Sequence, residues 1–115
     1  MGLSEFYAAV GGSAEQVMVR LVSEGLIRRF LGKFTADPSY AALKEALAAG
    51  DAEAAFRAAH TMKGTAANLG LDTLADAASA LTEVLRRGEL PPAALVDEVD
   101  RAYALTVAAI EALGA

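Results

Sequence analysis

The chain has 115 residues, no cysteine and one histidine, with a formal net charge of −5 and a hydrophobic fraction of 55%. This length and composition predict one folded domain over residues 1–115 and exclude disulfide frameworks and thiolate metal sites. The negative charge argues against nucleic-acid binding, and no apolar run is long enough to span a membrane. We therefore expect a cytoplasmic monomer with no cofactor of its own.

The N-terminal part of the chain predicts three helices. Leu3–Val10 is a helical candidate that the pair Gly11-Gly12 ends. Ser13 and Gln16 have the spacing of a capping box, which opens a second helix. After Ser23, apolar residues recur at helical spacing as far as Phe34.

The remainder predicts four longer helices, each with recognisable start and stop residues. The start signals are Asp37-Pro38, Asp51, Asp72 and Pro91-Pro92, and the stop signals are Gly50, Gly70 and Gly88. Short loops between amphipathic helices imply antiparallel neighbours. We predict an all-α, up-down-up-down four-helix bundle over about residues 23–113, with the short N-terminal helical segments covering one end.

The single histidine, His60, lies on the helix that Asp51 opens. Because successive helical residues turn by about 100°, five apolar residues of this helix share one arc that faces the core. These are Ala55, Ala59, Met62, Ala66 and Leu69. His60 falls about 140° from the middle of that arc, so we expect its imidazole to point into solvent.

Small residues follow His60 on its side of the helix. Gly64 lies one turn later. A glycine in a helix interior lowers the stability of the helix by about 1 kcal/mol relative to alanine, so its presence here indicates another role. Ala67 continues the low surface, and Phe56 borders it one turn before the histidine. We predict a face on which a broad partner can approach the imidazole, with Phe56 and Ala67 at the interface.

Two cations accompany the histidine. Lys63 lies one turn after His60, where its ammonium can stabilise the charge of a phosphoryl group on the ring. Arg57, one turn before, is placed to assist that group or to bind an acidic partner. Neutral imidazole is a nucleophile, and covalent phosphohistidine formation is one of its established roles. Unlike Lys63 and Arg57, the cations Arg86 and Arg87 are interpreted as part of a solvated helix face.

The segment "HTMKGTAANLG", His60 to Gly70, resembles the signature of histidine-containing phosphotransfer (HPt) domains of the stand-alone bacterial type, and the similarity extends over most of the chain. The resemblance implies a four-helix bundle that takes a phosphoryl group from an aspartate of one receiver domain and passes it to another. It implies His60 as the phosphorylated residue, Lys63 as charge support and Gly64 as steric clearance. The implied partners are response-regulator receivers and a hybrid histidine kinase, with magnesium on the receiver.

One position departs from the family pattern. HPt domains often carry Glu or Gln 22 residues after the histidine, and this chain has Thr82 there. Its hydroxyl is a candidate hydrogen-bond donor to the phosphoryl group.

Two alternatives to a phosphoryl carrier in a phosphorelay stay open at this point. The chain fits a non-catalytic module that binds a receiver or kinase, and it fits a structural helical domain with an inert surface histidine. In each case the chain is not an autonomous enzyme, since it has no glycine-rich nucleotide loop and no paired-carboxylate site.

Overall fold

The helix signals of the sequence each produce a helix in the computed structural model, which describes residues 1–114. The helices are α1 (Leu3–Val10), α2 (Ala14–Leu21), α3 (Glu24–Phe34), α4 (Ser39–Ala48), α5 (Ala52–Asn68), α6 (Asp72–Arg86) and α7 (Ala93–Leu113). None of them is both long and apolar enough to cross a membrane.

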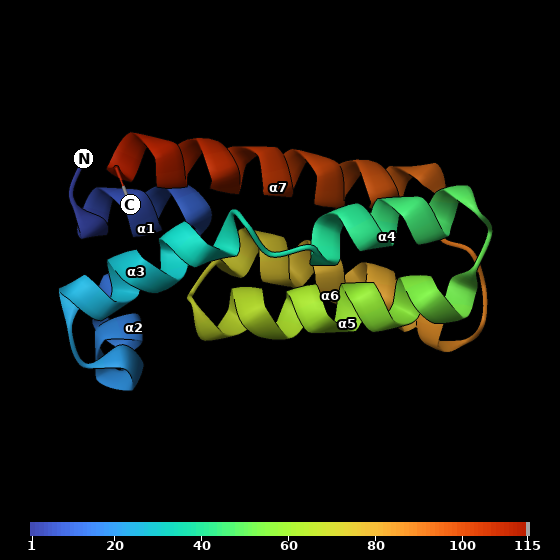
Figure 1. Ribbon diagram of the computed structural model, residues 1–115, viewed down its shortest axis with the longest axis horizontal. Coiled ribbons are helices and arrows are strands. Elements are labelled where there is room, and N and C mark those ends of the chain that lie inside the picture. The colour runs from blue at the N-terminus through green and yellow to red at the C-terminus, as the bar shows by residue number, and fades with distance from the viewer. Residues whose placement is uncertain (115) are drawn as a thin grey trace.

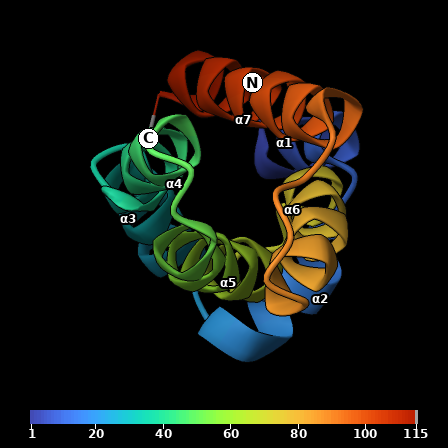
Figure 2. The ribbon, with the colours of Figure 1, turned by 90° about the vertical axis from the view of Figure 1, so that its right-hand side faces the viewer.

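Helices α4, α5, α6 and α7 run alternately along the long axis and occupy the four corners of a bundle (Figures 1 and 2). Helix α3 precedes α4 along the same edge, while α1 and α2 lie at the end where α5 turns into α6. The prediction of an up-down-up-down bundle with one covered end is confirmed.

The predicted caps Ser13 and Asp51 are present, and Ser23 caps α3 as well. The side chains of Ser13, Ser23 and Asp51 each accept a hydrogen bond from a backbone N–H in the first turn of the helix that follows. The prediction that Asp72 caps α6 is wrong, because the helix begins one residue earlier than expected and Leu71 is the N-cap. Asp72 is instead the first residue of α6, where a carboxylate interacts favourably with the helix dipole.

The core-facing arc predicted for α5 is confirmed. All five apolar residues of the arc are buried, and three of them are alanines, which let α5 pack closely against its neighbours. Since this arc fixes the rotation of α5 about its axis, it also fixes which residues of α5 face solvent.

Helices α1 and α2 are held in place against the turn between α5 and α6. The buried hydroxyl of Tyr7 donates to the carbonyl of Leu69 at 2.7 Å, and burial raises the pKa of Tyr7 to about 12, so the phenol remains a donor. Gly12 approaches the carbonyl oxygen of Gly70 so closely that a Cβ at Gly12 would overlap it. The N-terminal helices therefore have a defined position relative to α5.

A polar cluster joins α4 to α7. Tyr40 donates to Asp100 at 2.6 Å, Lys44 donates to the same carboxylate at 2.8 Å, and the Tyr40 ring stacks on Tyr103. Burial alone would raise the pKa of Asp100, but the hydrogen bonds from Lys44 and Tyr40 lower it below its ordinary value.

Replacing Asp100 with Asn is expected to lower the free energy of unfolding at pH 7 by about 1 kcal/mol, since the cluster is partly exposed and therefore screened. A carboxyl with a lowered folded-state pKa stabilises the fold above its unfolded-state pKa and loses that effect as the pH falls. The difference between the two proteins should thus shrink below about pH 4. Urea unfolding across this pH range measures it, with Asp97→Asn on the exposed side of α7 as the control. An equal effect of both substitutions would contradict a specific role for Asp100.

Candidate functional site

Helix α5 is a rigid platform with both ends secured. At its start the Asp51 carboxylate accepts from the N–H of Ala54 at 3.0 Å. At its end Gly70 takes a left-handed conformation, with φ of 75°, and the N–H of Leu71 donates to the carbonyl of Ala66. His60 lies in the middle of these 17 residues, away from the fraying ends.

The imidazole of His60 is exposed, as predicted. It stacks on the half-buried ring of Phe56, with the ring centroids 5.7 Å apart and the planes 16° from parallel. The guanidinium of Arg86, on α6, lies over the Phe56 ring, 5.1 Å from its centroid. Phe56 thus borders the histidine on one side and leaves the opposite direction along α5 open.

That open direction leads to Gly64. Apart from its chain neighbours and the nearby backbone of its own helix, a Cβ built on Gly64 would meet no atom of residues 1–114 within 4 Å, so the glycine is not required for packing between helices. Ala67, one turn further, is also exposed. The surface beside His60 therefore lacks bulky side chains, as predicted, and the packing of this chain does not explain the glycine at position 64.

The two cations predicted near His60 differ in their surroundings. Lys63 is half-buried and takes part in none of the salt bridges within residues 1–114. Arg57 is exposed and pairs with Glu53 at 3.0 Å, one turn back towards the start of α5. The ammonium of Lys63 thus has no acidic partner among these residues to compete with a phosphoryl group, whereas the charge of Arg57 is already shared.

The prediction that Thr82 offers its hydroxyl to the site is wrong. Helices α5 and α6 are antiparallel, and Phe56 on α5 lies against Arg86 on α6. One turn after Phe56 is His60, and one turn before Arg86 is Thr82, so these two residues lie at the same level of the two helices. Thr82 nevertheless has no exposed surface, and its hydroxyl donates to the carbonyl of Ala78 at 2.6 Å. Its side chain belongs to the core between the two helices.

Arg86 is the residue near the site that sequence reasoning missed. It was interpreted as part of a solvated face, but it reaches across from α6 to Phe56 and also approaches Glu83 at 3.5 Å. No motif marks it. The only signal was the antiparallel register, which places the end of α6 beside the start of α5.

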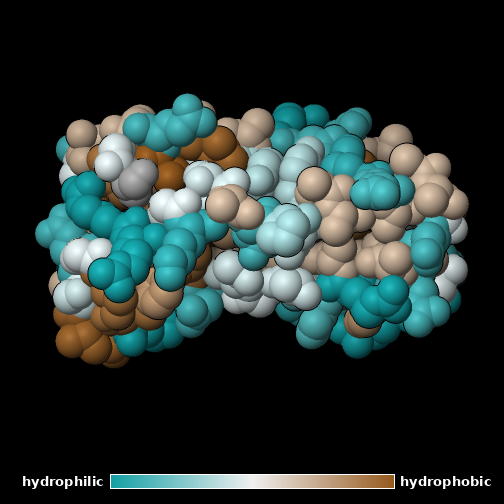
Figure 3. Space-filling model, in the orientation of Figure 1, coloured by the Kyte–Doolittle hydropathy of each residue, from teal (hydrophilic) through white to brown (hydrophobic). Residues whose placement is uncertain are grey.

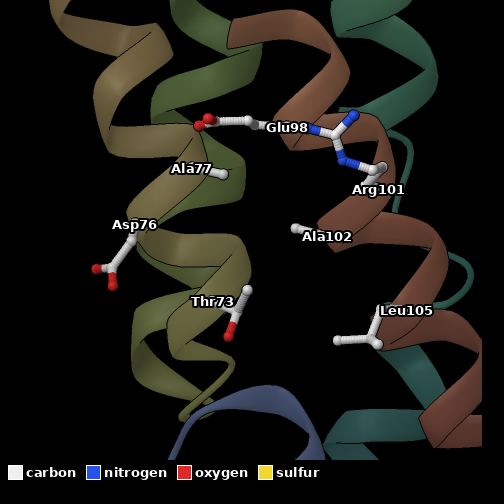
Figure 4. A pocket seen from close by; sticks show the side chains of 7 residues that line it. All are labelled: Thr73, Asp76, Ala77, Glu98, Arg101, Ala102 and Leu105. Carbon is white, nitrogen blue, oxygen red and sulfur yellow. The ribbon is translucent and has the colours of Figure 1, made fainter. Parts of the chain in front are cut away.

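A groove of about 430 Å³ lies elsewhere, between α6 and α7 (Figure 4). Ala77 and Ala102 line it together with the exposed Leu105, and Glu98 and Arg101 extend from α7 beside it. None of the residues of the His60 face lines this groove. It is therefore separate from the histidine site.

A helical bundle with an exposed imidazole on an open flank fits a class of protein in which another molecule reaches the histidine. In agreement, the family model described as "Hpt domain" matches residues 33–113, which is more than half of the chain. The chain belongs to the Hpt family of histidine phosphotransfer domains, which act in two-component signalling and interact with response-regulator receivers. No curated protein and no solved structure matches the chain. Helices α1 and α2 lie outside the matched residues.

Proposed function

We propose that this protein is a phosphorelay intermediate that accepts a phosphoryl group on His60 from a receiver-domain aspartyl phosphate and passes it to the aspartate of another receiver. The observation that carries the proposal is the open space at Gly64 beside an exposed imidazole on a rigid helix. A structural helix with an inert histidine gains nothing from a glycine at that position.

The transfer balances as a displacement at phosphorus. The unprotonated ring nitrogen of His60, which we assign as Nε2, attacks the phosphorus atom, and the P–O bond to the aspartate breaks. The aspartate leaves with the electron pair as a carboxylate, while the proton on Nδ1 stays on the ring. The reverse sequence, with the aspartate of a second receiver as the nucleophile, returns the imidazole to its neutral form.

The two proteins divide the work of this step. Phosphoryl transfer depends largely on positioning and on neutralising the charge of the moving group. The receiver supplies the aspartate and a magnesium ion, and this chain supplies the imidazole, the ammonium of Lys63 and the open face. Such a division makes the chain a phosphoryl carrier that works with its partner, with no cofactor of its own.

The test is a transfer screen against receivers encoded in the same genome. Each receiver is phosphorylated with a labelled small-molecule phosphodonor, freed of excess donor and mixed with this protein. The expected result is a label on this chain that acid removes and alkali does not, as a phosphorus–nitrogen bond requires. A chain that binds a phosphorylated receiver without acquiring the label would be a non-catalytic module, and the proposal would then be wrong.

Replacing Lys63 with Ala is expected to slow the transfer roughly tenfold without preventing it. Two unit charges 4 Å apart interact by about 1 kcal/mol in water and about 4 kcal/mol near a protein surface, and about 1.4 kcal/mol corresponds to a tenfold change in rate. Rapid-quench measurement of the labelling rate with one receiver checks this, and Lys63→Arg, which keeps the charge, should retain most of the rate. Equal rates for wild type and Lys63→Ala would remove the lysine from the mechanism.

A further inference from the structure

The surface around His60 gives its ring few contacts that could fix its orientation. An exposed histidine on a helix has two favoured settings of χ1 and two broad settings of χ2, so about four orientations are open to the ring. Gly64 and Ala67 are small, and the surface over α5 is mostly polar or weakly hydrophobic (Figure 3). A ring in this position needs another contact to keep its reacting nitrogen in one place.

Phe56 provides that contact. It precedes His60 by one helical turn, a spacing at which side chains meet, and long side chains on a helix lean towards its N-terminus. The imidazole accordingly stacks on the Phe56 ring, with the centroids 5.7 Å apart and the planes 16° from parallel. Aromatic pairs at such distances favour the stacked arrangement by about two- to tenfold.

Stacking fixes the plane of the imidazole without covering the atom that reacts. The lone pair of the unprotonated ring nitrogen lies in the plane of the ring, whereas a stacked neighbour covers a face. Phe56 therefore leaves the ring edge free for an in-line approach to phosphorus. The stack lies towards the start of α5 and the open space at Gly64 lies towards its end, so Phe56 does not obstruct that space.

Phe56 is itself held by α6. Its ring is half-buried against the core, and Leu85 and Arg86 line the same hollow of about 290 Å³. The guanidinium of Arg86 lies 5.1 Å from the centroid of the Phe56 ring, which is within the distance of a cation–π contact. The same guanidinium approaches the carboxylate of Glu83 at 3.5 Å. Contacts thus run from α6 through Arg86 and Phe56 to the imidazole of His60.

We propose that Phe56 is a positioning residue for the phosphotransfer reaction. Supported by Arg86, it holds the His60 imidazole in the orientation from which the ring nitrogen attacks the aspartyl phosphate of a docked receiver. This inference rests on the proposed phosphotransfer function, and Phe56 takes no part in the bonds that form and break. A ring that is free to occupy about four orientations spends about a quarter of its time in the reactive one, so loss of the stack should slow transfer about threefold.

The stack itself is tested on the free protein by nuclear magnetic resonance. Because the chain has one histidine, the imidazole C–H signals belong to His60. Phe56→Leu keeps apolar bulk but removes the aromatic ring current, so we expect these signals to move towards the positions of an unstacked histidine. Phe56→Tyr keeps the ring and should leave them nearly unchanged. Identical signals for wild type and Phe56→Leu would show that the rings do not stack, and the inference would be wrong.

Transfer kinetics test the consequence of the stack. With a receiver that labels wild type, the labelling rate is measured against receiver concentration. We expect Phe56→Leu to lower the maximal rate about threefold and to leave the half-saturating concentration unchanged, since the orientation of the imidazole affects the chemical step and leucine keeps apolar bulk at the docking face. Arg86→Met, which removes the support but keeps the Phe56 ring, should lower the maximal rate less.

Two variants serve as controls in the same assay. Phe56→Tyr should retain the wild-type rate because it keeps the aromatic ring. Phe30→Leu should also retain it, since Phe30 is another half-buried phenylalanine but lies on α3. A loss with Phe30→Leu equal to the loss with Phe56→Leu would show a general effect of removing an aromatic ring, and Phe56 would have no specific role.

Phosphoramidate, a small-molecule phosphodonor, gives a second comparison. It approaches a freely rotating imidazole from any direction, so it should label Phe56→Leu and wild type at the same rate. A variant that phosphoramidate and the receiver label equally slowly would have an imidazole of altered reactivity, and the positioning role would be wrong.

The remaining outcomes separate the two proposals. If a receiver labels wild type and Phe56→Leu at the same maximal rate, the stack does not position the ring, whatever the half-saturating concentration, and the phosphotransfer proposal stands. If Arg86→Met slows transfer more than Phe56→Leu does, the guanidinium acts on the phosphoryl group directly and the inference is wrong. If no receiver labels wild type, both proposals are wrong. Circular dichroism and thermal unfolding verify that each variant is folded.

Discussion

Replacing His60 with Gln is expected to abolish the phosphoryl label completely while leaving the bundle folded. The amide of glutamine has no nucleophilic nitrogen, and the chain holds no second histidine that could take over. Since the imidazole is exposed and stacks on one side of the half-buried Phe56 ring, the free energy of unfolding should change by no more than about 0.5 kcal/mol. Autoradiography after incubation with a phosphorylated receiver measures the first effect, and urea unfolding measures the second.

This variant also separates docking from chemistry. His60→Gln should still bind the receiver, because the rest of the His60 face is unchanged, and titration calorimetry can measure that binding. A label that persists on the variant would have to sit on another residue type, and an alkali-labile label would identify a carboxylate. Either finding would contradict the assignment of His60 as the acceptor.

Replacing Gly64 with Leu is expected to reduce the transfer rate by about a hundredfold while the protein becomes no less stable. Beyond the chain neighbours and the nearby backbone of α5 itself, the Cβ of an added side chain meets no atom of residues 1–114 within 4 Å, so the fold has room for it. Leucine is also a better helix former than glycine, which favours the fold by up to about 1 kcal/mol. The same side chain stands where a docked receiver must lie, and misplacing the reacting atoms by 1 Å is enough for a loss of about a hundredfold.

Two further variants make this result specific. Gly64→Ala adds only a methyl group, so it should gain most of the stability and lose less of the transfer rate. Ala104→Leu adds similar bulk on an exposed position of α7 and should leave the transfer rate unchanged. Stopped transfer assays and urea unfolding on the same preparations give both quantities. A Gly64→Leu protein that is less stable and transfers normally would show that the glycine serves the fold and not the partner.

Substitution of Gly64 is expected to lower the transfer rate without lowering stability, and both effects follow from the position of the residue in the structure. The glycine lowers the stability of its own helix, and no side chain or neighbouring helix of residues 1–114 occupies the space beside it, so packing within the fold does not explain it. Lys63 gives a second example, since it is half-buried yet has no acidic partner among residues 1–114. Both features fit the proposal that a phosphorylated receiver docks on this face.

The sequence by itself predicts most of what is local in this protein. Helix periodicity depends on residues three and four apart, so it was sufficient to place the five buried residues of α5 inside and His60 outside. Caps such as Ser13 and Asp51 act within one turn, and they were found for the same reason. The motif from His60 to Gly64 lies on one helix, so its geometry follows from the helical repeat alone.

Only the tertiary structure decided what depends on how separate helices meet. The register between α5 and α6 buries Thr82, which the family resemblance had made a candidate, and it brings Arg86 over Phe56. The contact of Arg20 on α2 with the end of α5 joins residues 48 positions apart and holds α2 at the end of the bundle where α5 turns into α6. Such contacts are set by the packing of whole helices, and a one-turn shift between two helices would change them all without altering any local pattern.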